Sequence, residues 1–130
     1  MVQQPVVVGL LVCEQIIIEE RTGNVTPVNC FSRKFVPQFP AIPFSFVALA
    51  FLTNGSGEVT LEVVIHRLDS YEDIYRRSHK YLFASPLDQV RCAIRINDCP
   101  FPVEGQYEIA LCANNEIIAQ RKITIAKEKK

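Results

Sequence analysis

Short apolar runs, separated by clusters of turn-forming residues, follow one another along the chain. In several runs apolar and polar residues alternate, which is the period of a strand with one buried face. No segment keeps the period of a helix for three turns. The predicted strands are residues 6–19, 25–36, 44–53, 59–68, 74–84, 90–96, 107–113 and 117–125. Short strands at this regular spacing predict an all-β fold of two packed sheets.

Four sequence details place these runs within the sheets. Gly9 falls inside an unusually long run, which indicates a bend or bulge there. Pro27 lacks a backbone N–H, so its run is expected at a sheet edge. Residues 44–53 are apolar on both faces, as in a central strand covered on both sides. In the last run Arg121 interrupts the inward-facing apolar positions.

The segments between the runs carry turn chemistry. Residues 21–24, 54–57 and 114–115 hold Gly or Asn, which tolerate positive φ, and are predicted as turns between antiparallel strands. Residues 85–88 would join 74–84 to 90–96 as a further hairpin. The Gly105-Gln106-Tyr107 segment allows two interpretations, the tyrosine corner of immunoglobulin-like folds or a core tyrosine after a turn. The prediction is an immunoglobulin-like, two-sheet antiparallel β-sandwich of about 7–9 strands.

Length and composition indicate the size of the domain and the compartment in which the protein is expected. The 130 residues suit one domain, expected over 1–126, with a charged flexible tail at 127–130. Lysine and arginine number 14 and so do aspartate and glutamate, so no bulk charge draws the chain to nucleic acid or to an anionic membrane. The apolar run 6–12 is too short to span a bilayer, and no Lys or Arg precedes it. We therefore expect a cytoplasmic protein without membrane contact.

The cysteines Cys13, Cys30, Cys92, Cys99 and Cys112 form no CxxC pair and no metal-ligand spacing. Free thiols in a reducing compartment are expected. A tight turn at 21–24 would bring Cys13 and Cys30 close together, so whether this pair is bridged stays open. We predict no metal-binding and no cofactor-binding residues.

Candidate catalytic residues are few. His66 shares the polar face of its run with Thr60 and Glu62, so it is expected in solvent, whereas His79 is expected half-buried. Cys99 is the best-placed thiol for reactivity, but nothing cationic adjoins it to lower its pKa. Nucleophilic catalysis needs a nucleophile beside an oriented base, and no such signature is present. No catalytic residue is predicted, and the chain is expected not to be an enzyme.

One charged feature stands out. If 74–84 and 90–96 pair, Arg76 and Lys80 lie beside Arg91 and Arg95 on an outward face, because alternate side chains point the same way. Four like charges repel unless anions neutralise them. These four residues are therefore the candidate partner-binding site, and the alternative is a solvated face neutralised by nearby carboxylates.

The order of motifs is similar to that of a known family. The segments that carry the likeness are residues 12–19, 22–23, 35–40, 53–58 and 102–107, and the Val-Pro-Gln-Phe-Pro stretch at 36–40 is the most specific. The chain resembles a family of small uncharacterised bacterial proteins expected to form a single immunoglobulin-like β-sandwich. The resemblance implies the fold and a bacterial origin, and it carries over no activity and no functional residue.

Three functions follow as hypotheses. The first is a non-enzymatic protein-interaction module, since sandwiches recruit partners through exposed strand edges. The second is binding of a polyanion, a nucleic acid or a phosphate-bearing ligand, through the basic face, although no aromatic residue interleaves with those arginines. The third is a catalytic subunit completed by another chain. The partner, the pathway and the oligomeric state are not encoded in a form that one sequence reveals.

Overall fold

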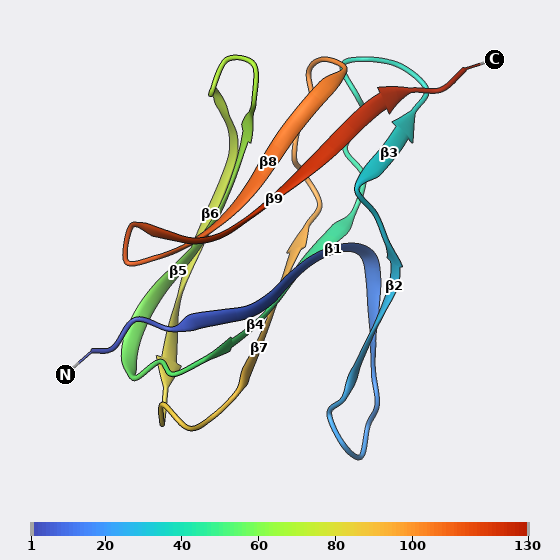
Figure 1. The fold of residues 1–130 in the computed structure, drawn as a ribbon. Coiled ribbons are helices and arrows are strands. Elements are labelled where there is room, and N and C mark those ends of the chain that lie inside the picture. The colour runs from blue at the N-terminus through green and yellow to red at the C-terminus, as the bar shows by residue number, and fades with distance from the viewer. Residues whose placement is uncertain (1, 130) are drawn as a thin grey trace.

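The computed structural model describes residues 2–129 and holds nine strands and no helix within them (Figure 1). The strands are β1 (Val6–Ile18), β2 (Val25–Cys30), β3 (Arg33–Val36), β4 (Phe46–Thr53), β5 (Gly57–Arg67), β6 (Asp73–Phe83), β7 (Val90–Ile96), β8 (Gly105–Ala113) and β9 (Glu116–Lys127). They form a first sheet in the order β2-β1-β4-β7 and a second in the order β3-β9-β8-β5-β6. The predicted all-β, two-sheet architecture is confirmed. No helix in the described part could cross a membrane.

The main core lies between the two sheets. Inward residues of β4, such as Phe46 and Leu52, meet inward residues of β5, such as Leu61 and Ile65, and all are buried. Tyr107, at the start of β8, is buried as well, and its hydroxyl donates a 2.5 Å hydrogen bond to the Val103 carbonyl. This bond satisfies the polar end of an otherwise apolar side chain. The alternation in the sequence therefore predicted the inner faces of β5 and β8 correctly, whereas Ile117, expected inward in the last strand, is 55% exposed on the outer face.

The second sheet is mixed, so the prediction of antiparallel strands throughout is wrong. The predicted strand 25–36 divides at Phe31 and Ser32, where the chain leaves the first sheet for the second. Phe31 packs edge-on against Phe46 of the core, with ring centroids 6.1 Å apart. Past this crossing, β3 pairs with β9 in parallel. Pro27 lies in β2 at the edge of the first sheet, as its missing N–H requires.

Strand β1 pairs with two strands, one after the other along its length. Its first part pairs with β4, with an irregularity between Val7 and Gly9 where a bulge was predicted. Beyond Cys13 it pairs with β2, and Figure 1 shows the strand bending sharply into that hairpin. We call residues 15–28 the hairpin arm. The Gly23 carbonyl at its tip accepts a hydrogen bond from the Arg91 guanidinium of β7, which lies at the far edge of the first sheet.

The hairpin arm covers the outer face of the first sheet. Ile16 and Val25 of the arm pack against a second apolar cluster that contains Val47 and Leu49 of β4. These two residues lie on the opposite face of β4 from the main core, and Leu49 is 0% exposed. The central strand is therefore covered on both sides, as its apolar sequence predicted.

Two predicted hairpins are crossings between the sheets. Residues 54–57 join β4 to β5, and 85–88 join β6 to β7, and each pair of strands belongs to different sheets. At the first crossing Gly55 lies against the Phe83 ring, where a Cβ would meet ring atoms at 2.9 Å. The turns at 21–24 and 114–115 do join paired neighbours, β1 to β2 and β8 to β9. Turn-forming residues reverse the chain in both cases, so they do not reveal which sheet comes next.

Arginine side chains link the two sheets at their open sides. Arg77 of β6 donates to the Arg95 carbonyl of β7 at 3.0 Å, and Arg121 of β9 donates to the Leu10 carbonyl of β1 at 3.0 Å. Arg121 therefore interrupts the apolar pattern because it satisfies a carbonyl of the other sheet. Strand β9 ends at Lys127, one residue beyond the predicted domain boundary, and the Glu128 amide still donates to the Val36 carbonyl. The predicted tail ends at Lys130, which, like Met1, lies outside the described residues.

Candidate functional site

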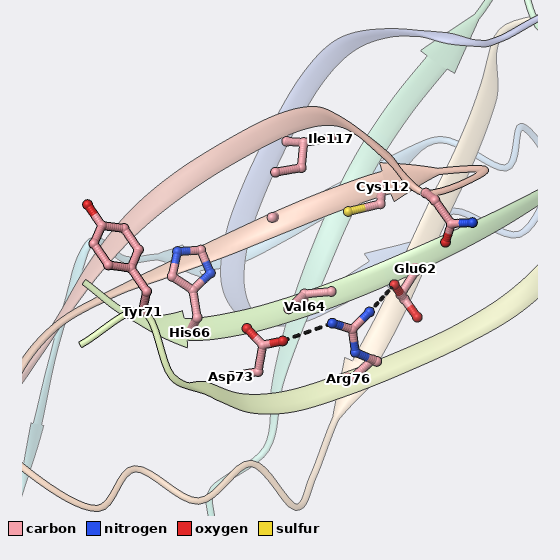
Figure 2. A pocket seen from close by; sticks show the side chains of 10 residues that line it. Glu62, Val64, His66, Tyr71, Asp73, Arg76, Cys112 and Ile117 are labelled. Atoms are coloured by element: carbon pink, nitrogen blue, oxygen red, sulfur yellow. Dashed lines mark hydrogen bonds and ion pairs between the residues drawn. The ribbon is translucent and has the colours of Figure 1, made fainter. Parts of the chain in front are cut away.

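A hollow of about 330 Å³ opens on the outer face of the second sheet (Figure 2). It is lined by Glu62, Val64, His66, Tyr71, Asp73, Arg76, Ala110, Cys112, Asn115 and Ile117. Register explains the clustering, because Val64 of β5 lies opposite Ala110 of β8 and Arg76 of β6. Alternate side chains of neighbouring strands share a face. The hollow is therefore built by the outward positions of adjacent strands.

The floor of the hollow is apolar and buried, although it belongs to an outer face. Val64, Ala110 and Cys112 are 7%, 2% and 7% exposed. Ile117 of β9 forms an apolar wall and is itself exposed. Outward strand positions are usually polar, so a buried apolar floor there differs from an ordinary solvated face.

Charged side chains line one side of the hollow. The Arg76 guanidinium lies between the Glu62 carboxylate, at 2.5 Å, and the Asp73 carboxylate, at 2.8 Å, as Figure 2 shows. The hydrogen bond that Arg76 donates to Asp73, followed by the charge of Glu62, raises the pKa of Arg76. A guanidinium is a planar donor that holds two acceptors in fixed directions. The three side chains therefore form an ordered ionic group beside the floor.

The rings of His66 and Tyr71 form another part of the lining. The rings of His66 and Tyr71 stack with centroids 6.1 Å apart and an interplanar angle of 26°. Tyr71 belongs to the turn between β5 and β6, adopts a φ of 57°, and is 76% exposed. His66 Nε2 lies 3.4 Å from Glu108 Oε1 of β8. In register, His66 lies between Asp73 on one side and Glu108 on the other.

The thiol in the hollow is not set up as a nucleophile. Burial, followed by the charge of Glu62, raises the pKa of Cys112. A reactive cysteine needs the opposite shift, because the thiolate is the attacking species. No group of three or more metal-ligating side chains occurs among residues 2–129. The raised pKa therefore disfavours attack by the Cys112 thiol.

The predicted basic face is not assembled, because the pairing on which it depended is wrong. Arg76 and Lys80 lie on β6 in the second sheet, whereas Arg91 and Arg95 lie on β7 in the first. Strand β6 pairs instead with β5, whose glutamates lie next to the basic residues in diagonal positions. Of the four, Arg76 therefore enters the hollow, and the others are elsewhere.

Each of the other three basic residues has a contact. Lys80 Nζ lies 3.7 Å from Glu58 Oε1 of β5. Arg91 donates to the hairpin arm, as described above, and Arg95 donates to the Ser45 hydroxyl at 3.2 Å. Their charges are thus not crowded together, and the argument that an external anion must neutralise them no longer applies. A partner-binding role for the four residues stays a prediction.

The burial of His66 and the exposure of His79 are the reverse of what was expected. His66 was expected in solvent, but its side chain is 14% exposed, because strands and the Tyr71 ring surround it. His79 was expected half-buried, but it is exposed on the edge strand β6, with Nε2 3.9 Å from Cys92 Sγ. Burial raises the pKa of Cys92 to about 11. This Cys–His contact therefore holds a protonated thiol at neutral pH.

The remaining cysteines are free thiols in the structure. Cys99 was the best-placed candidate for reactivity, but it is buried, and burial followed by the charge of Asp98 raises its pKa to about 12. Cys13 and Cys30 are partners in the β1–β2 register, so the predicted proximity is confirmed. Cys13 is buried and Cys30 is exposed.

Sequence reasoning missed the floor of the hollow, although a signal for it existed. Val64 interrupts the alternation of its run, and residues 109–113 are apolar at every position. A strand that is apolar on both faces predicts cover on both faces. That signal was applied to residues 44–53 but not to the strands that carry Val64, Ala110 and Cys112.

Comparisons with known proteins concern the fold. An alkylpurine DNA glycosylase, AlkC, from Pseudomonas fluorescens, solved bound to DNA containing an abasic site analog, is similar over 94% of this chain, with a TM-score of 0.54 and 10% identity. The similar part is 30% of that chain. A β-glucosidase from Kluyveromyces marxianus is similar over 72% of this chain and 14% of its own, with a TM-score of 0.48 and 11% identity.

No curated protein matches the sequence. The model of a family of unknown function, DUF6941, matches residues 9–126. These residues include every strand from the bulge in β1 almost to the end of β9, and thus the whole lining of the hollow. The chain belongs to this family, DUF6941.

Proposed function

We propose that this chain is a non-enzymatic protein-interaction module with an immunoglobulin-like sandwich. Three features support the fold assignment. The pairing of β4 with β7 corresponds to strands B and E, and the order β9-β8-β5 corresponds to G, F and C. Tyr107 at the start of β8, bonded back to Val103, has the position and hydrogen bond of a tyrosine corner on strand F.

The observation that carries the proposal is the buried apolar floor on the outer face of the second sheet. Val64, Ala110 and Cys112 are enclosed by ordered charged and aromatic side chains. Interfaces concentrate their binding energy where one partner's side chain fills a pocket surrounded by polar groups. A hollow of about 330 Å³ lies at the lower end of ligand-sized cavities. One protruding side chain of a partner protein would be accommodated here.

Two exposed residues provide a matched test. Ile117→Arg places a charge in the wall of the hollow, and Leu82→Arg places the same charge on β6, outside the lining. Both positions are exposed, so both variants should keep the circular dichroism spectrum and the melting temperature of the native chain. In affinity capture from the native host, Ile117→Arg should lose a protein that Leu82→Arg retains. Equal capture by the two variants would remove the hollow as the docking site.

Polyanion binding has less support than protein binding. Each of the residues Arg76, Lys80, Arg91 and Arg95 already contacts a carboxylate, a carbonyl or a hydroxyl of this chain. The DNA in the glycosylase structure is bound by a chain of which this fold makes up 30%, and 10% identity is evidence for the fold only. Affinity for a polyanion that falls with salt, and that the fourfold replacement by glutamine abolishes, would favour this alternative.

A further inference from the structure

We propose that the occupant of the hollow is a basic side chain, lysine or arginine, of the partner protein. This inference rests on the proposed function, because it specifies the chemistry of the same docking site. The argument combines the charge of the lining, the shape of the apolar floor and the position of Tyr71.

The lining carries more negative than positive charge. The carboxylates of Glu62 and Asp73 share a single guanidinium, that of Arg76, so one negative charge remains on this ionic group. Glu108 of β8 lies outside the lining, with its carboxylate 3.4 Å from His66 of the lining. An acidic occupant would be repelled, and a cation would be attracted.

The cations nearest to the hollow do not cancel this excess. Lys122 of β9 is the register partner of Glu108, and both lie outside the lining, so the two together add no net charge to it. Lys80 is next to Glu58, at 3.7 Å, away from the hollow. Arg121 reaches Leu10 in the other sheet. A cationic side chain of a partner would therefore balance the negative charge that remains on the lining.

The floor suits the aliphatic stem of a basic residue. Lysine and arginine bury their methylene chains along apolar surface while the charged head stays near water or carboxylates. Val64, Ala110 and Ile117 offer such a surface across three adjacent strands. A purely apolar side chain would also fill this volume, but it would gain nothing from the carboxylates around it.

The charged head has a defined place, at the Tyr71 side of the hollow. His66 lies between Asp73 and Glu108 there, and the Tyr71 ring is exposed beside it. An aromatic face attracts a cation by about 0.5–1 kcal/mol at an exposed site. Figure 2 shows the Tyr71 and His66 rings together at one end of the hollow, with Asp73 below them. The stem thus meets the apolar floor, and the head meets the Tyr71 side of the hollow.

The test uses three blocked amino acids as probes on the full, isotope-labelled chain. They are the N-acetyl methylamides of lysine, norleucine and glutamate, which present a cationic, an apolar and an anionic side chain. The lysine probe should shift the methyl signals of Val64, Ala110 and Ile117 in NMR spectra. It should bind at least about threefold more tightly than the norleucine probe, and the glutamate probe should not bind.

A matched pair of variants locates the head. Glu108→Gln removes the carboxylate beside His66 and should weaken the lysine probe by about threefold. Glu58→Gln removes a carboxylate of the same sheet face that lies next to Lys80, away from the lining, and should leave binding unchanged. Equal affinity for norleucine and lysine, preferred binding of glutamate, or binding of no probe would overturn the inference. The proposed function fails separately, when Ile117→Arg and Leu82→Arg capture the same proteins.

Discussion

Replacing Leu49 by alanine tests whether the hairpin arm covers the first sheet. Leu49 is 0% exposed on the outer face of β4, in the cluster against which Ile16 and Val25 of the arm pack. Truncation would remove buried methyl groups and leave a cavity, and buried leucine-to-alanine changes lower the free energy of unfolding by about 2–5 kcal/mol. We expect a loss of about 3 kcal/mol here. On an uncovered face the same change would cost less than about 0.5 kcal/mol.

The measurement is urea unfolding of the full chain, followed by far-UV circular dichroism and tyrosine fluorescence. Ile16→Ala and Ile17→Ala form the matched pair, because these neighbours point to opposite faces of the arm. Ile16 packs on the cluster, and Ile17 is 58% exposed. Ile17→Ala should change the free energy of unfolding by less than about 0.5 kcal/mol. Ile16→Ala should cost more, since it removes packing against this cluster.

A double-mutant cycle between Leu49 and Ile16 measures the coupling between the cluster and the arm. Residues that share one packed cluster show coupling of about 0.5 kcal/mol or more, whereas separated residues are additive within that value. A cost below about 1 kcal/mol for Leu49→Ala, or additivity in this cycle, would refute the docking of the arm.

Three other predictions concern buried polar groups and thiols. Tyr107→Phe removes the donor to the Val103 carbonyl and should lower the free energy of unfolding by about 1–3 kcal/mol in the same urea experiment, and an unchanged midpoint would contradict the role of this bond. A thiol reagent at pH 8 should label the exposed Cys30 rapidly and the buried cysteines slowly in the native chain, with five thiols after denaturation. The pKa values of about 11 for Cys92 and about 12 for Cys99 lie above those of the unfolded thiols, so the native state keeps protons that the unfolded state loses. Stability should therefore be intact below pH 9 and fall as the pH rises towards 11–12, and Cys92→Ala with Cys99→Ala should flatten that fall.

Local rules predicted what depends on one residue's backbone. The irregularity at Gly9 and the edge position of Pro27 follow from a missing Cβ and a missing N–H, and both are present in the structure. The loops 54–57 and 85–88 were predicted less well, because a turn sequence reverses the chain equally in a hairpin and in a crossing between sheets. Strand assignment then depends on packing between distant residues, which no local pattern contains.

In the candidate site too, the local pattern predicted some features, whereas others depend on which strands are adjacent. Alternation placed Arg76 and His66 on outward faces correctly, but their neighbours depend on strand order. With β6 next to β5, Arg76 meets Glu62 and Asp73 instead of the arginines of β7. A pattern of period two identifies a face, whereas the ionic and aromatic partners on that face follow from which strands are adjacent.

The parallel pairing of β3 with β9 also constrains the order in which the chain can fold. Arg33 pairs with Thr124 and Val36 with Lys127, so this contact closes a loop that contains all the strands between them. Contacts between residues so distant in sequence carry a high loop-closure entropy and slow the folding of β-rich domains. During synthesis, β3 must wait with an unpaired edge until β9 has emerged. Residues 33–36 are consequently the segment of this chain most in need of protection before folding is complete.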